Sequence, residues 1–213
     1  MTSEIFLQFE KEKANAFNIF TALLCQPTED LPVDDTVFNS LISSLEIICP
    51  ASVAAAKGMK EGIKAYSQVE LLVEYTRLFI GPFKLLVPPY SSMYFGTKEL
   101  MSEETLWVIN FYDKMGLAFD TDIKDAPDHI AVETEFLYYL IFNSIKEYSE
   151  GDLDNAIKFW TGQNEFFSIH FQKWVPQFCA GIKEHSNNDF YISMADCLAV
   201  LVIEISNPTF PQE

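Results

Sequence analysis

The sequence predicts an all-α protein, a bundle of about eight or nine helices in two lobes joined by a hinge. Apolar residues recur at steps of three and four along nearly the whole chain, as they do on one face of a helix. Capping residues and prolines separate these stretches, and no stretch alternates as a strand does. With 213 residues, 49% of them hydrophobic, the chain can bury a large core without disulfides or metals.

The first helices can be delimited by their caps. Ser3 is the expected N-cap of the first helix, and Pro27 lies beyond its end. Residues 67–70 have the pattern of a capping box, in which a serine and a glutamate three positions later satisfy each other's backbone donors. This box opens a helix whose inner side is expected to carry Tyr75 and Phe79.

Two irregular segments divide the chain. Residues 80–101 form a long connection rich in aromatic and aliphatic side chains, which must pack against the protein or a ligand. Residues 117–127 carry several aspartates and are the expected hinge. The predicted organisation is therefore an N-terminal lobe of residues 1–116 that includes the aromatic loop, the acidic hinge, and a C-terminal lobe of residues 128–213.

The helices of the second lobe also have recognisable ends. Asp128 is expected to cap the first of them, and Gly151 suits its C-terminal end. Asp152 is expected to cap the next helix, which should break at Pro176 because proline cannot donate to the helical ladder.

The composition limits the function classes. The 31 acidic residues against 14 basic residues give a formal net charge of −17, which argues against nucleic acid and against an anionic membrane surface. This charge favours a cationic partner, although acidity also serves solubility alone. Four widely separated cysteines favour free thiols in a reducing compartment. Without a secretory signal pattern or a long apolar run, we expect a cytoplasmic protein with no direct membrane insertion.

Motifs of catalysis and cofactor binding are absent from the sequence. It has no P-loop, no G-x-G-x-x-G, no G-x-S-x-G and no H-E-x-x-H. His129 and Glu133 share a helix face, but a metal there would need further ligands. The sequence therefore predicts no catalytic residues, no metal and no cofactor. A metal- or nucleotide-dependent enzyme on a helical bundle is the alternative.

Three stretches in order resemble the TorD/DmsD family of redox-enzyme maturation chaperones. Residues 74–82 contain Y-x-R-L-F-x-G-P and lead into P-P-Y-S-S-M-Y at 88–94. Residues 127–137 contain the D-H start of a helix, and residues 166–176 contain H-x-x-x-W. The match in order and spacing covers most of residues 68–176.

The resemblance implies a function without catalysis. It implies a cytoplasmic chaperone that binds the twin-arginine signal peptide, the core, or both, of a molybdenum-cofactor oxidoreductase. Binding would last during cofactor loading and would precede export through the Tat pathway. The resemblance leaves a monomer and a domain-swapped dimer open, and it carries a suggestion of weak nucleotide binding for which the sequence offers no phosphate site.

The candidate site residues lie in the aromatic loop and at the Asp128-His129 helix start. A receptor for arginines followed by an apolar run needs carboxylates and an aromatic-lined groove. Helix capping and loop packing are the competing structural roles of these residues. The expected peptide-binding residues are Asp128, His129, Glu133, Tyr90, Tyr94 and Ser92.

A second group of residues is expected to have a structural role, anchoring the aromatic loop, rather than to bind the peptide. Arg77 is the single arginine, and we expect a salt bridge to Asp128, Glu133 or Glu135 that fixes the loop to a helix. The other members of this structural, loop-anchoring group are Tyr75, Phe79, His170 and Trp174.

Overall fold

The computed structural model describes residues 2–28, 34–81, 85–118, 125–205 and 208–211, and within these ranges it contains nine α-helices and no strand. The all-α prediction is therefore confirmed. Two π-helical turns, η2 and η4, and two 3₁₀ turns, η1 and η3, complete the regular structure. The helices are α1 (Ser3–Leu24), α2 (Asp35–Ile48), α3 (Val53–Ala65), α4 (Gln68–Tyr75), α5 (Glu103–Lys114), α6 (Ile130–Glu150), α7 (Leu153–Phe166), α8 (Gln172–His185) and α9 (Asp189–Glu204). The short turns are η1 (Pro50–Ser52), η2 (Thr76–Ile80), η3 (Ser91–Met93) and η4 (Phe167–Phe171).

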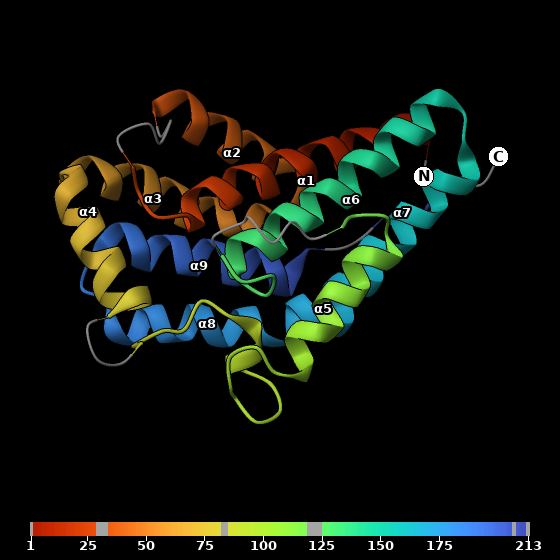
Figure 1. The fold of residues 1–213 in the computed structure, drawn as a ribbon. Helices are drawn as coiled ribbons and strands as arrows, with labels where there is room; N and C mark the ends of the chain where they lie inside the picture. The colour runs from red at the N-terminus through yellow and green to blue at the C-terminus, as the bar shows by residue number, and fades with distance from the viewer. Residues whose placement is uncertain (1, 29–33, 82–84, 119–124, 206–207, 212–213) are drawn as a thin grey trace.

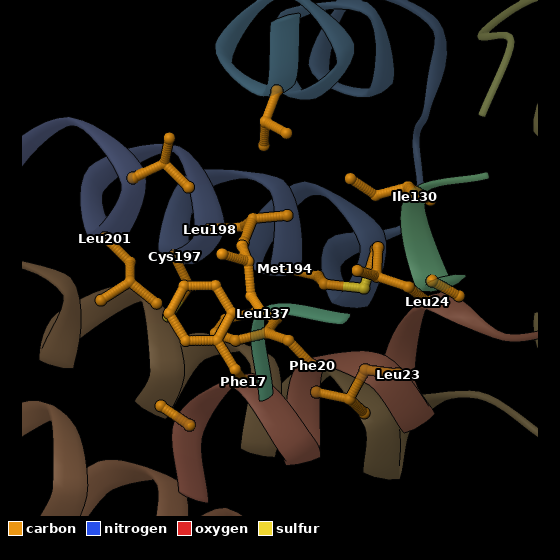
Figure 2. Close-up of a cluster of buried hydrophobic side chains, with 14 of the residues drawn as sticks. Phe17, Phe20, Leu23, Leu24, Ile130, Leu137, Met194, Cys197, Leu198 and Leu201 are labelled. Carbon is orange, nitrogen blue, oxygen red and sulfur yellow. The ribbon is translucent and has the colours of Figure 1, made fainter. Parts of the chain in front are cut away.

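The core lies between α1, α6 and α9 (Figures 1 and 2). Phe17 and Phe20 of α1 point toward Leu137 of α6 and Leu198 of α9 (Figure 2). Each of these side chains is at most 1% exposed, and burying a side chain of this size contributes about 1.5–3 kcal/mol. Helix α3 also packs on α9, and α7 and α8 extend the core by packing on α6 and α9, respectively (Figure 1).

Several helix ends follow the sequence pattern. Ser67 and Glu70 form the predicted capping box at the start of α4. Gly151 ends α6 in the left-handed conformation with φ 84°, and Asp152 caps α7 through the backbone N–H of Asn155. These features could be predicted because every partner lies within four residues.

The predicted helix ends at Ser3 and Pro176 are wrong. Thr2 rather than Ser3 caps α1, since the Thr2 hydroxyl accepts from the N–H of Ile5. Pro176 does not break its helix but lies inside α8. The π turn η4 ends at Phe171, directly before α8, so Pro176 lies in the second turn of α8. The buried side chains of Val175 and Phe178 on either side of the proline hold the helix in place, which outweighs the one helical hydrogen bond that proline cannot donate.

Helices from before and after residues 117–127 pack together, α1 against α6 and α3 against α9. Part of the expected hinge, residues 119–124, lies outside the described residues. The division into two lobes at this segment stays a prediction. None of the helices in the described ranges is both long and apolar enough to cross a membrane.

Candidate functional site

The aromatic loop and the start of α6 lie against each other. Tyr90 and His129 form an isolated antiparallel bridge, and their rings meet edge to face with centroids 5.4 Å apart. The backbone N–H of Ile130 donates to the carbonyl of Pro89 at 2.8 Å. The N–H of Ser91 likewise donates to the carbonyl of Asp128 at 2.9 Å. These bonds join residues 88–94 to residues 127–137, which are two of the stretches that carry the family resemblance.

Asp128 is not the N-cap of α6, so that prediction is wrong. Its Oδ2 instead accepts the backbone N–H of Ser92 at 3.0 Å, and both side chains are fully buried. The cap is His129, whose Nδ1 accepts from the N–H of Ala131 at 3.2 Å. The helix begins at Ile130, one residue later than a cap at Asp128 would require, so the imidazole of His129 occupies the N-cap position.

His129 must be unprotonated at Nδ1 to accept this bond, and burial lowers its pKa, against the nearby charges of Asp125 and Asp128. When a histidine has a lower pKa in the folded than in the unfolded chain, the unfolded chain takes up its proton first as the pH falls. The folded protein therefore becomes less stable as the pH falls below the pKa of the histidine in the unfolded chain. We therefore expect the free energy of unfolding to fall more between pH 7.5 and pH 5 in the wild type than in His129→Asn. Asparagine caps a helix without titrating. Urea titrations at several pH values measure this difference, and parallel pH profiles would contradict it.

Glu133 connects α6 to the helix that contains the H-x-x-x-W motif. Its Oε1 lies 2.8 Å from Nε2 of His170, and its Oε2 accepts the indole N–H of Trp174 at 2.9 Å. The His170 ring also stacks on Phe95 and Trp107, with centroids 5.2 Å and 4.8 Å away. The Glu133 carboxylate is fully buried, so in this structure it holds the aromatic loop and α5 to the core.

Arg77 does not pair with Asp128, Glu133 or Glu135, and this prediction is wrong. Its Nε and Nη2 instead donate to the two carboxylate oxygens of Glu74, each at 2.8 Å. Nη2 also donates to the carbonyl of His185 at 2.5 Å. The hydroxyl of Ser186 donates to Glu74 Oε1 at 2.6 Å, so the ion pair is bonded to the end of α8 and to the residue after it rather than to α6.

An open pocket of about 320 Å³ lies beside the contact between Tyr90 and His129. Among the described residues that line it, Asp125 carries the formal charge and none is a lysine or arginine. Asp125 is exposed at the start of the segment that leads into α6. The lining residues are Cys25, Gln26, Tyr75, Phe79, Ile80, Pro89, Tyr90, Asp125 and His129.

The charge of Asp125 acts on the whole pocket. The pKa of Tyr90 is raised by burial and, next, by the negative charge of Asp125. The pKa of the Cys25 thiol is raised by burial and then by Asp125 and Glu135. The pocket therefore combines aromatic walls with a negative potential, an arrangement that suits a cation with an attached apolar chain.

The predicted site residues divide into two groups. Tyr90 and His129 line the pocket. The others do not line it: Ser92, Asp128 and Glu133 are fully buried, and the Tyr94 hydroxyl donates to the Pro88 carbonyl at 2.9 Å. Direct contact of these four with a peptide stays an untested prediction.

Two pairs of pocket residues were not expected there. Tyr75 and Phe79, expected only as loop anchors, form part of the pocket wall, where their rings meet at 4.9 Å. Asp125 and Cys25 were not singled out as site residues. The acidic linker was the only sequence signal for Asp125, and nothing local marks Cys25.

The pair His129 and Glu133 does not form a metal site here, because each has another partner in its own neighbourhood. Within the described ranges no cluster of three or more histidine, cysteine or acidic side chains could hold a metal ion.

The described part of the chain is thus an all-helical protein with a pocket that is lined by aromatic side chains and Asp125. The pocket lies beside the aromatic loop. Residues 48–180 match the family described as nitrate reductase delta subunit, and the chain belongs to this family. The resemblance to redox-enzyme maturation chaperones is thereby confirmed.

Individual relatives support this assignment. A chaperone protein TorD from Vibrio parahaemolyticus is 29% identical over 133 residues, which are 62% of this chain and 60% of that relative. The chain thus spans less than two thirds of that protein. A chaperone protein TorD from Photobacterium profundum is 22% identical over 206 residues, covering 91% of this chain and 92% of the relative. The crystal structure of a putative redox enzyme maturation protein from Archaeoglobus fulgidus has a similar fold, with a TM-score of 0.55, 22% identity, and coverage of 87% and 91%.

Proposed function

We propose that this chain is a chaperone that binds the twin-arginine signal peptide of a molybdenum-cofactor oxidoreductase during cofactor loading and before Tat export. The observation that carries the proposal is the pocket beside Tyr90 and His129, whose lining joins aromatic rings to an exposed carboxylate. Family membership supports a redox enzyme as the client, since related proteins bear the names of a chaperone and of a redox enzyme maturation protein.

The chemistry of the pocket suits an arginine. The exposed Asp125 carboxylate can accept two parallel N–H donors from a guanidinium. The half-buried ring of Tyr90 lines the pocket and can contact a cation, and a neutral His129 adds no repulsion. The formal net charge of −17 raises the local concentration of a basic peptide, and salt weakens this effect.

The proposal includes a cytoplasmic site of action and no catalytic step, cofactor, nucleic acid or membrane insertion. The chaperone could instead bind the folded core of the client. This second mode of binding predicts affinity for a client that lacks its signal peptide. No observation favours the alternative of a metal- or nucleotide-dependent enzyme. Oligomeric state, monomer or domain-swapped dimer, does not alter the chemistry of the pocket.

Calorimetric titration with a synthetic twin-arginine signal peptide tests the proposal. We expect saturable binding that weakens with salt, and a loss of affinity of about tenfold, or about 1.4 kcal/mol, in Asp125→Asn. Asp113→Asn is the matched control, because it removes the same charge from an exposed position on α5. If both variants lost the same affinity for the peptide, the effect of Asp125 would come from the net charge of the protein rather than from direct contact. Absence of wild-type binding at about 100 μM peptide would overturn signal-peptide binding.

A further inference from the structure

A second pocket, of about 230 Å³, adjoins the first. Cys25, just beyond the end of α1, lines both of them. The remaining walls come from the ends of α1 and α3 and from the starts of α4 and α9. The lining residues are Leu23, Cys25, Pro27, Thr28, Ile63, Tyr66, Gln68, Leu71, Phe190 and Tyr191.

The two pockets differ in chemistry. The second pocket has aliphatic and aromatic walls, and none of its described lining residues carries a formal charge. Its walls are held together, since the Tyr191 hydroxyl donates to the carbonyl of Leu71 at 3.0 Å. At Gly62 the backbones of α3 and α9 come so close that an added Cβ would lie 2.9 Å from the backbone nitrogen of Phe190. The second pocket is therefore a preformed and uncharged surface, lined mainly by aliphatic and aromatic side chains together with the polar Thr28 and Gln68.

We infer that the two pockets form one track for a single extended peptide, with its arginines at Asp125 and its apolar run in the second pocket. This inference rests on the proposed function and adds the direction of the bound chain. A twin-arginine signal carries its arginines before its apolar run. The peptide therefore enters at the Asp125 end, passes Cys25, and lays its apolar side chains against Ile63 and Tyr66.

Charge and continuity favour this occupant. A purely apolar segment would leave the carboxylate of Asp125 unused, and a purely basic segment would leave the uncharged second pocket unfilled. A chain that is basic first and apolar afterwards complements both pockets, and the shared residue Cys25 places them side by side.

Substitution of Ile63 separates the two halves of the track. Ile63 is half-buried on α3, and Ile63→Glu brings a charge into the apolar pocket. We expect at least tenfold weaker binding of the full signal peptide, with no change for a short peptide that has the arginines but serine and glycine in place of the apolar run. Asp125→Asn is expected to weaken both peptides. Ile203→Glu is the matched control, because Ile203 is 60% exposed on α9 and lines neither pocket.

The native thiol offers a second measurement on the unaltered fold. Cys25 is exposed, whereas Cys49, Cys179 and Cys197 are buried. Peptides with one thiopyridyl-activated cysteine are placed in turn before the arginines, between the arginines and the apolar run, and at the end of the run. We expect disulfide trapping to be strongest at the middle position and absent in Cys25→Ser. Because partial removal of the thiol from water and the nearby charges of Asp125 and Glu135 raise the pKa of Cys25, the exchange is best run near pH 8.5.

The outcomes distinguish the inference from the proposed function. Binding that depends on Asp125 but not on Ile63, with trapping equal at all positions or strongest before the arginines, would overturn the track and leave the proposed function standing. Failure of the wild type to bind the full peptide would overturn both. Loss of the full peptide alone in Ile63→Glu, with trapping centred on the middle position, supports the track.

Discussion

Replacing Glu133 with leucine is expected to lower the free energy of unfolding by about 3–5 kcal/mol. The carboxylate is fully buried and bonded at both oxygens, to the ring of His170 and to the indole N–H of Trp174. Leucine has a suitable volume but no acceptor, so both partners would remain buried without a hydrogen bond. That loss exceeds the gain from burying an additional apolar side chain.

Urea unfolding followed by tryptophan fluorescence measures this effect. Glu135→Leu is the matched control, because Glu135 is exposed two residues along the same helix. Its change should stay within about 0.5 kcal/mol. Glu133→Gln, which retains one acceptor oxygen, should lose less than the leucine variant. If the leucine variants at the two positions were equally stable, the bonds to His170 and Trp174 would contribute nothing measurable.

Local features of the fold could be predicted from the sequence. The capping box of Ser67 and Glu70, the end of α6 at Gly151 and the cap of α7 at Asp152 involve neighbours only. The period of apolar residues also reports local geometry, because it records which face of each helix is buried. The sequence therefore predicts the helices and many of their ends well.

Features that depend on distant partners could not be predicted in the same way. Asp128 follows the local rule for a cap, but the N–H of Ser92, 36 residues away, takes its carboxylate. Arg77 finds its second partner, the carbonyl of His185, 108 residues away. The rule that predicts a break at Pro176 likewise considers only the helix itself and not the buried side chains on either side of the proline.

The candidate site illustrates the same limit. The resemblance singled out Tyr90 and His129, which do line the pocket, because they lie in stretches with a recognisable pattern. The charged member, Asp125, comes from a linker, and Cys25 comes from the end of α1. Only the packing of α1 beside α6 brings these segments together, and no spacing in the sequence records it.

The second large effect is expected at a buried ion pair far from the pocket. Lys13 and Glu10 are 2% and 0% exposed, with Nζ 2.6 Å from Oε1. Gln163 of α7 donates to the other oxygen of Glu10 at 2.7 Å. Burial lowers the pKa of Lys13 although the charge of Glu10 opposes this, so removal from water outweighs attraction for the lysine.

Lys13→Met is expected to lower the free energy of unfolding by about 3–5 kcal/mol, because it leaves the Glu10 carboxylate buried without its cation. Lys11→Met, at an exposed position of the same helix, should have little effect. The double variant Glu10→Gln/Lys13→Met removes both charges and retains an acceptor for Gln163. It should recover more than half of the loss, since the cost comes from an unpaired charge rather than from missing attraction. A double variant as unstable as Lys13→Met alone would instead assign the loss to the packing of the lysine stem against its neighbours. Urea denaturation of the four proteins therefore separates charge from packing at this site.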